Sequence, residues 1–428
     1  MKQNVLIFPC GSEIGLEAHK ALRFSTHFNL VGASSVDDHG KFVFENYVGD
    51  LPFVTAPDFL DKVNEAVDSY KIDFIIPAHD NVLLQLAKAK AAGKLHCELI
   101  TSPLKTCEIA TSKLKTYNFF KDILPIPHVF KTVDEVKKVD LPVFLKPEVG
   151  NGSRGTQTAK TLEDITFYTE KDPSLLLLEF LPGKEFTVDC FTNRHSELLF
   201  CKARQRARIG NGISTNSMHV ASERFQKLAE TINKYLAWRG VWFFQVKENA
   251  KGELVLVEIA PRAAGTSGLA RGKGVNLLLL SLFDALGYDV DVFENSYEMV
   301  IDRALQNRYK HNITYKHVYL DFDDLVIFDG KVNPEVMAFV YQCLNQKVAI
   351  HLITKHQDDI EKTLKKYRLN GIFDDIIHIK KEDEKAHYIK EKEAIFIDDS
   401  FAERKKVHYN CHIPTFDGHM IEGLIEKF

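Results

Sequence analysis

Three features are scarce in this 428-residue sequence: paired cysteines, long apolar runs and an excess of one charge. The seven cysteines are scattered with no CxxC spacing, so neither a zinc site nor a disulfide framework is indicated. No apolar run approaches the ~20 residues of a membrane span, and the N-terminal apolar stretch is too short for a signal peptide. The net charge of −4 gives no reason to expect nucleic-acid binding. These absences predict a cytoplasmic protein with no nucleic-acid partner and no membrane partner.

The composition that is present suits a globular protein of several domains. Hydrophobic residues make up 45% and charged residues 27%, which is enough for a real core. At ~150 residues per domain, the length indicates about three domains. We divide the chain into residues 1–105, 106–312 and 313–428. We expect α/β architecture in the first and third parts and α+β architecture in the second.

The first hundred residues alternate apolar strands with helices. Strands are expected at Asn4–Phe8, Phe28–Gly32 and Asp73–Pro77, with a glycine-containing turn after the first. This is the doubly wound pattern, in which ligands collect at the carboxyl ends of strands. His79 and Asp80 follow the third strand, where they act either as substrate contacts or as a turn and helix cap. The glycine spacing is not GxGxxG, so a dinucleotide site is weakly supported.

A phosphate-binding pattern follows in the second part. A helix is expected from about Thr111 to Leu124, and Lys146 then ends an apolar strand. The loop Glu148–Gly155 has three glycines in six residues, which allows backbone N–H groups to approach an anion closely. Lysine and loop together predict a phosphate site.

The stretch Leu254–Gly268, LVLVEIAPRAAGTSG, combines a strand with isolated charged residues. An acid such as Glu258 is costly to bury without a partner, and Mg²⁺, shared with substrate phosphates, is the partner that suits it. Arg262 adds a fork of donors that fits phosphate or carboxylate. The alternative is an edge strand whose acid faces water.

Three arginines alternate along the expected strand that contains Arg204, Arg206 and Arg208. The period of two places them on one face, where they repel one another unless an anion binds there. That anion would be a triphosphate or a carboxylate substrate, and the alternative is a solvated surface strand. The run from Trp242 to Gln245 is expected to be core.

Together these motifs resemble the ATP-grasp superfamily, most closely its carbamoyl-phosphate-synthase-like branch, over roughly residues 1–305. The resemblance implies a pre-ATP-grasp domain followed by an ATP-grasp fold, with ATP held between two α+β subdomains. The implied nucleotide ligands are Lys113, Lys146, the loop residues Glu148, Gly152, Ser153 and Gly155, the adenine hinge Glu179, Phe180 and Leu181, the ribose ligand Glu185, and Arg204 and Arg206. The implied magnesium ligands are Gln245 and Glu258, and Arg262 would stabilise an acyl phosphate.

One position departs from the family pattern. The family usually has Asn two residues after the metal-binding Glu, and Ala260 stands there in this chain. Alanine has no oxygen to offer a metal, so this departure bears on turnover more than on ATP binding.

In the last third of the chain, several apolar strands each end in polar or acidic residues. Apolar strands end in Asp321 and Asp323, in Thr354, and in the pair Asp398 and Asp399. In a parallel sheet these ends share one site. Four aspartates there need a cation to offset their repulsion, and one could serve as nucleophile while another donates a proton.

These residues are similar to the haloacid dehalogenase-like (HAD) superfamily over about residues 315–428. The resemblance implies a Rossmann-like domain with Asp321 as nucleophile and Asp323 as general acid and base. The other implied roles are a phosphate ligand at Thr354, a charge-steadying Lys385 with Lys380 and Lys381 as competitors, and magnesium ligands among Asp321, Asp323, Asp398 and Asp399. Asp324 and Leu325 stand where the family usually has Gly and Thr. The short segments between motifs leave no room for a large cap.

Three classes of function remain open. The first is a bifunctional enzyme, an ATP-dependent carboxylate–amine ligase joined to a phosphatase. The second is an enzyme with only one active half, and the third is a nucleotide-binding regulatory or scaffold protein. The expected cofactors are ATP and Mg²⁺, with Mn²⁺ as a substitute. The expected partners are a carboxylate, an amine and a phosphorylated small molecule, and a homodimer is compatible with the sequence.

Overall fold

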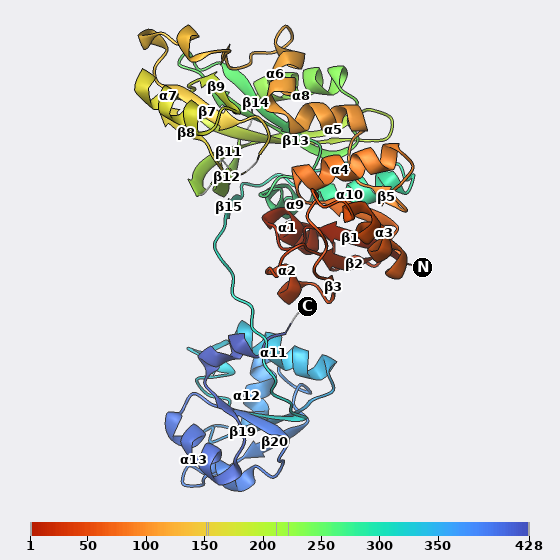
Figure 1. The fold of residues 1–428 in the computed structure, drawn as a ribbon. Helices are drawn as coiled ribbons and strands as arrows, with labels where there is room; N and C mark the ends of the chain where they lie inside the picture. The colour runs from red at the N-terminus through yellow and green to blue at the C-terminus, as the bar shows by residue number, and fades with distance from the viewer. Residues whose placement is uncertain (1, 151, 153, 211, 221, 427–428) are drawn as a thin grey trace. The chain divides into compact units, whose positions relative to one another are not determined.

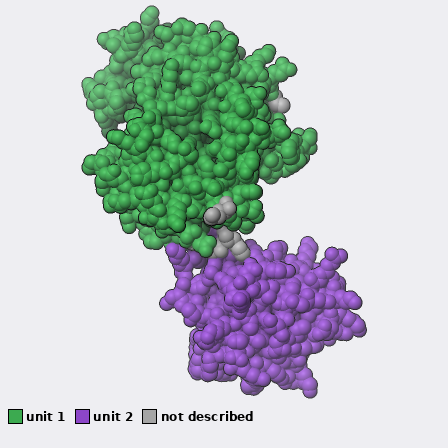
Figure 2. Space-filling model, turned by 90° about the vertical axis from the view of Figure 1, so that its right-hand side faces the viewer, with its two compact units in different colours: residues 1–305 green, residues 306–428 purple. Residues whose placement is uncertain are grey.

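The chain folds into two compact units, residues 1–305 and residues 306–428 (Figure 2). The computed structural model describes residues 2–150, 152, 154–210, 212–220 and 222–426. In the part of the chain described, no helix has both the length and the apolar character needed to cross a membrane.

The first unit begins with a parallel five-stranded sheet in the order β3-β2-β1-β4-β5 (Figure 1). Its strands are β1 (Gln3–Phe8), β2 (Phe28–Ala33), β3 (Asn46–Val48), β4 (Phe74–Pro77) and β5 (Glu98–Leu99). Its helices are α1 (Glu13–Leu22), α2 (Gly40–Val43), α3 (Phe59–Ser69) and α4 (Asp80–Ala91). Alternate residues of β1 enter different cores: Val5 and Ile7 pack with α1, and Leu6 and Phe8 pack with α3. Helices therefore cover both faces, as the doubly wound pattern requires.

Two antiparallel sheets complete the first unit. The smaller has the order β6-β9-β7-β8, from β6 (Val129–Phe130), β7 (Val143–Pro147), β8 (Gln157–Ala159) and β9 (Leu175–Glu179). The larger has the order β14-β13-β10-β11-β12-β15, from β10 (Glu185–Thr192), β11 (Leu198–Gly210), β12 (Ile213–Val220), β13 (Gly240–Glu248), β14 (Leu254–Ala260) and β15 (Val300–Asp302). The accompanying helices are α5 (Leu104–Thr111), α6 (Lys113–Phe120), α7 (Leu162–Lys171), α8 (Glu223–Tyr235), α9 (Gly268–Gly272) and α10 (Leu277–Ala285).

The second unit is built on another parallel five-stranded sheet, in the order β20-β19-β16-β21-β22. Its strands are β16 (His317–Leu320), β19 (Ala349–Thr354), β20 (Asp375–His378), β21 (Ala394–Ile397) and β22 (Thr415–Phe416). A small hairpin of β17 (Ile327–Phe328) and β18 (Lys331–Val332) and the helices α11 (Pro334–Asn345), α12 (Ile360–Tyr367) and α13 (Phe401–Cys411) surround it. Apolar side chains pack on both faces, with Leu320 in one core and Tyr319 in the other.

The expected mixed α/β architecture is present. The helix expected from about Thr111 to Leu124 corresponds to α6, which begins at Lys113 and ends at Phe120, and a separate helix, α5, ends just before it at Thr111. Ser112 has an extended backbone, and its side chain accepts a hydrogen bond from the Lys115 N–H at 3.1 Å. Serine at this position satisfies an otherwise unpaired donor at the helix start, which favours a new helix over a continued one.

Candidate functional sites

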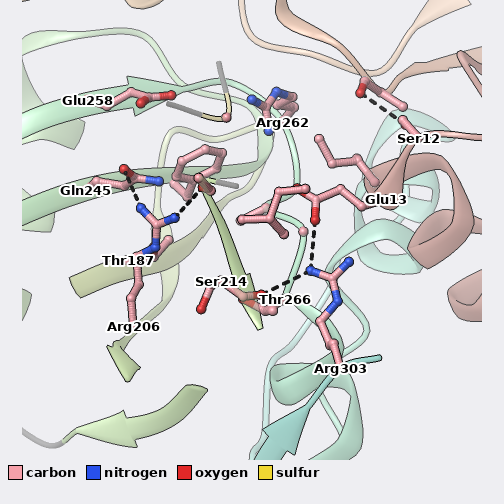
Figure 3. Close-up of a pocket in the computed structure, with 18 of the residues that line it drawn as sticks. Ser12, Glu13, Thr187, Arg206, Ser214, Gln245, Glu258, Arg262, Thr266 and Arg303 are labelled. Carbon is pink, nitrogen blue, oxygen red and sulfur yellow. Dashed lines mark hydrogen bonds and ion pairs between the residues drawn. The ribbon is translucent and has the colours of Figure 1, made fainter. Parts of the chain in front are cut away.

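A cavity of about 760 Å³ lies over one face of the larger antiparallel sheet in the first unit (Figure 3). Strands β10 to β14 supply its polar floor, and the N-cap and first residue of α1 supply Ser12 and Glu13 opposite. A smaller cavity of about 210 Å³, lined by Lys113, shares Glu258 with the first. The two cavities bring together residues that are far apart in the sequence.

Gln245 and Glu258 face each other as register partners on β13 and β14. Both side chains line the larger cavity, and Figure 3 shows them at the same side of it. The Gln245 side-chain oxygen accepts a hydrogen bond from Arg206 at 3.3 Å. In the part of the chain described, no hydrogen bond reaches the Glu258 carboxylate, so its oxygens are available to a cation. Oxygen ligands of these two kinds suit Mg²⁺.

Two lysines enter the same region from α6 and β7. Lys146 is 5% exposed, and its ammonium lies 3.3 Å from the Val257 carbonyl oxygen and 5.4 Å from the centre of the Tyr117 ring. Burial and then the neighbouring Lys113 lower the pKa of Lys146 to about 7. Lys113 donates a hydrogen bond to the Gly150 carbonyl at 2.7 Å. A ligand with two or three negative charges would favour the protonated form of Lys146, which burial disfavours.

Arg262 is held by the carboxylate of Asp80, the first residue of α4. Its Nε and one terminal nitrogen lie 2.7 Å and 2.6 Å from the two Asp80 oxygens, and its guanidinium lies 5.1 Å from the centre of the Phe243 ring. Burial alone would raise the pKa of Asp80, but the Arg262 charge outweighs it and holds that pKa below its usual value. His79 caps α4 by accepting a hydrogen bond from the Asn81 N–H at 3.4 Å, and it lines both cavities. The cap is therefore present, and a substrate contact by this pair stays a prediction.

Arg204 and Arg206 lie on one face of β11, as expected, because both line the larger cavity. Each of the three arginines also has an acidic partner that the sequence did not reveal. Arg204 is buried and binds both oxygens of Asp189 at 2.7 Å and 3.2 Å. Arg206 pairs with Glu185, which was expected to bind ribose. The strand bulges between Arg206 and Arg208, and Arg208 pairs with Asp302 near the surface at 2.7 Å. Acidic side chains of β10 and β15 therefore offset the arginine charges.

The remaining expected nucleotide ligands lie on the smaller sheet and its loops. Glu179 ends β9, and its carboxylate accepts a hydrogen bond from the His128 N–H at 3.2 Å. Phe180 lies 5.8 Å from the Lys247 ammonium, and Leu181 is buried. Glu148 accepts a hydrogen bond from the Ser112 hydroxyl.

Gly152 lines the larger cavity, and Gly155 has a φ of +73°, which favours glycine. Ser153 lies outside the described residues.

A second cluster lies at the carboxyl edge of the parallel sheet in the second unit. The Lys385 ammonium lies 2.7 Å from Asp321 and 2.6 Å from Asp398, and it is only 3% exposed. Burial raises the pKa of Asp321, and Lys385 opposes that rise. Carboxylate oxygens of Asp321, Asp398 and Asp399 lie within 4.8 Å of one another, which is close enough to hold one metal ion.

Two further expected residues border this cluster. The Asp323 oxygens lie 2.9 Å and 3.0 Å from His356 Nδ1, a partner that sequence reasoning missed. Thr354 is fully buried at the end of β19, and its hydroxyl accepts a hydrogen bond from the His356 N–H at 3.1 Å. Of the three competing lysines, Lys385 contacts the acids, whereas Lys380 and Lys381 line a neighbouring cavity of about 500 Å³.

Comparison with known proteins bears on the first unit. The profile of the family described as "ATP-grasp in the biosynthetic pathway with Ter operon" matches residues 171–306. Residues 171–306 are therefore similar to the ATP-grasp family, and we refer to the first unit, which contains nearly all of this match, as the ATP-grasp unit. The carbamoyl phosphate synthase large chain of Clostridium beijerinckii is 25% identical over 186 residues, which cover 38% of this chain and 17% of that one. The D-alanine–D-alanine ligase of Bacteroides fragilis is 24% identical over 183 residues, which cover 38% of this chain and 55% of that one.

A solved structure supports the same fold. The biotin carboxylase domain of Hydrogenobacter thermophilus 2-oxoglutarate carboxylase, a dimer in complex with MgADP, ADP and bicarbonate, matches with a TM-score of 0.57 and 14% identity. The match covers 69% of this chain and 72% of that one. This chain spans less than a fifth of the clostridial synthase and about half of the alanine ligase.

Ala260 of the ATP-grasp unit is buried against Phe243 and Ala264. It pairs with Phe243 across β13 and β14, two residues along from the pair formed by Gln245 and Glu258. The Phe243 side chain therefore occupies the space beside Ala260, a relation that depends on strand register and could not be read from the sequence.

Proposed function

We propose that the ATP-grasp unit is an ATP-dependent carboxylate–amine ligase that acts through an acyl phosphate. The observation that carries this proposal is the convergence of Gln245, Glu258 and Arg262 on one cavity, with Lys146 buried nearby. These are the groups that phosphoryl transfer to a carboxylate requires, because its catalysis rests on positioning and charge stabilisation. The names of the matched synthase and alanine ligase favour the same reaction class.

Each residue has a distinct task in this mechanism. When bound, Mg·ATP supplies the phosphoryl group and offsets the charge on its own phosphates. Gln245 and Glu258 would hold the metal, and Lys113 and Lys146 would bind phosphate oxygens. Arg262, fixed in orientation by Asp80, would bind the carboxylate as it becomes an acyl phosphate. An amine then attacks the acyl carbon, forms the C–N bond and expels phosphate.

The test is ADP formation by the full chain with pooled carboxylates and amines. We expect ADP release only when both a carboxylate and an amine are present, and loss of most activity in Glu258→Gln. Glu253→Gln is a matched control, because Glu253 is exposed one residue before β14 and bonds only locally to Asn249. ATP binding without turnover across the pools would instead favour a regulatory or scaffold role.

We further propose that the second unit is a HAD-like, metal-dependent phosphatase. The observation that favours it is the buried contact of Lys385 with both Asp321 and Asp398. Packing alone gives no reason to gather these charges in one place, and a phosphoryl group with a cation would offset them. The Asp321 carboxylate would attack phosphorus and form an aspartyl phosphate, while Asp323 protonates the departing alkoxide. Water would then hydrolyse the aspartyl phosphate and release inorganic phosphate.

Hydrolysis of phenyl phosphate by the full chain tests this second activity. We expect hydrolysis that requires Mg²⁺ or Mn²⁺, that stops in EDTA, and that falls by at least about a thousandfold in Asp321→Asn. Asp375→Asn is the control, because Asp375 is the first residue of β20 and so lies at the amino end of the parallel strands, away from the acidic cluster at their carboxyl ends. Equal activity of wild type and Asp321→Asn, or none in either, would contradict the phosphatase assignment.

A further inference from the structure

A groove in the second unit adjoins the acidic cluster without belonging to it. The turn after β19 and the loop after β20 line this cavity of about 500 Å³. The lining residues are Lys355, His356, Gln357, His378, Ile379, Lys380, Lys381 and Glu382. We call these eight residues the basic groove. The proposed phosphatase mechanism assigns no role to the basic groove.

The basic groove lies beside Asp323, the residue that would protonate the leaving group. His356 lines the groove, and its Nδ1 lies 2.9 Å from Asp323. The other ring nitrogen of His356 lies 3.1 Å from the Thr363 hydroxyl, and His378 bonds the His356 carbonyl oxygen at 2.7 Å. The hydrogen bonds of both histidine rings thus hold this side of the groove in place. A general acid must lie beside the oxygen that departs, so the space next to Asp323 is where a leaving group would extend.

The charges in the groove have one predominant sign. Lys355 is paired with Glu403 at 2.8 Å. Lys380 and Lys381 are exposed, and among the described residues neither has an acidic side chain within ion-pair distance. Glu382 is the one acid among the lining residues. Two lysines that follow each other in the chain and have no ion-pair partner among the described residues attract an anion through their combined positive charge.

We propose that the basic groove binds a second anionic group on the leaving-group side of the phosphatase substrate. The substrate class is then a phosphate monoester whose alcohol carries a further phosphate or carboxylate. This inference rests on the proposed phosphatase activity. Lys380 and Lys381 are specificity residues in this scheme and take no part in bond breaking.

Three aryl phosphates that differ in the para substituent test the groove with the full chain. Phenyl phosphate carries no second anion, 4-carboxyphenyl phosphate carries a carboxylate, and hydroquinone bisphosphate carries a second phosphate. We expect kcat/KM to be at least about tenfold higher for one or both of the anionic esters, chiefly through KM, and the preference to shrink at high salt. The ester with the larger gain identifies the anion.

Paired lysine variants locate the effect. Lys380→Ala/Lys381→Ala should remove most of the preference and leave phenyl phosphate hydrolysis within about twofold. Lys365→Ala/Lys366→Ala is the matched control, because these adjacent lysines are exposed on α12 and do not line the groove.

Hydrolysis of all three esters with equal kcat/KM, or a preference that survives in Lys380→Ala/Lys381→Ala, would overturn the groove assignment and leave the phosphatase standing. Failure to hydrolyse any ester would overturn both.

Discussion

At the scale of single residues, Lys146 links nucleotide binding to pH. Its pKa is lowered to about 7 by burial and then by Lys113, so the free unit loses this proton as pH rises through 7. Phosphate favours the charged form, so binding above pH 7 should take up a proton. We expect ATP affinity to fall by up to ~tenfold per pH unit above pH 7. Calorimetry in buffers of different ionisation enthalpy measures the uptake.

Lys146→Met should abolish this proton uptake and weaken ATP binding at pH 6, where the wild-type lysine is already charged. Lys115→Met serves as the control, because Lys115 lies on the same helix as Lys113 and is exposed. Uptake that persists in Lys146→Met would assign the proton to another group.

The buried pair of Arg204 and Asp189 predicts an asymmetry in stability. Arg204→Ala should lower the free energy of unfolding by about 3–5 kcal/mol, because it leaves the buried Asp189 carboxylate without a partner. Arg208→Ala should lower it by at most about 1 kcal/mol, because its ion pair with Asp302 is exposed. The double variant Arg204→Met/Asp189→Leu should cost less than Arg204→Ala. Tryptophan fluorescence in denaturant measures this unit selectively, because both tryptophans of the chain, Trp238 and Trp242, stack within it at 4.1 Å.

Residue types at strand ends could be predicted from the sequence, but their partners could not. Glu258, Lys146 and the aspartates of the second unit stand out because charged groups are costly inside apolar runs. The pairing of Arg204 with Asp189 depends on which strands lie side by side, and the contact of His356 with Asp323 joins segments 33 residues apart. Local periodicity in the sequence predicts neither of these two contacts.

At the scale of elements, the packing at the end of β14 accounts for an alanine at position 260. Its side chain shares a face with Glu258 but is packed against Phe243. Ala260→Asn alone should destabilise the unit by about 1–3 kcal/mol through overpacking. Phe243→Ala/Ala260→Asn should accommodate the amide and lower the Mg²⁺ concentration needed for half-maximal ATP binding. A Mg²⁺ requirement equal to that of Phe243→Ala alone would show that the amide does not reach the metal.

Element existence was more predictable than element boundaries. The apolar runs of β1, β4 and β14 identify these strands, whereas the division into α5 and α6 at Ser112 rests on one capping serine. The three-residue strand β15 has too little sequence for any periodicity to reveal it.

At the scale of the whole molecule, the segment after Asp302 separates two units with their own cores. Residues 306–314 contain no helix or strand and are mostly exposed. Trypsin under native conditions should therefore cleave within this segment first. We expect an N-terminal fragment that keeps ATP binding and a C-terminal fragment that keeps any phosphatase activity, as measured after separation. Loss of both activities on cleavage would mean that the units depend on each other.

The strand β15 sets a limit on where the chain can be shortened. It covers the outer edge of β12, with Asn216, Ser217 and Met218 paired to its three residues. Arg303 continues the contact through its N–H to the Thr215 carbonyl at 2.8 Å. A fragment that stops before Val300 would leave this row of backbone donors and acceptors open to a strand of another molecule. Such a fragment should self-associate and precipitate as its concentration rises, whereas one that extends past Arg303 should stay dispersed.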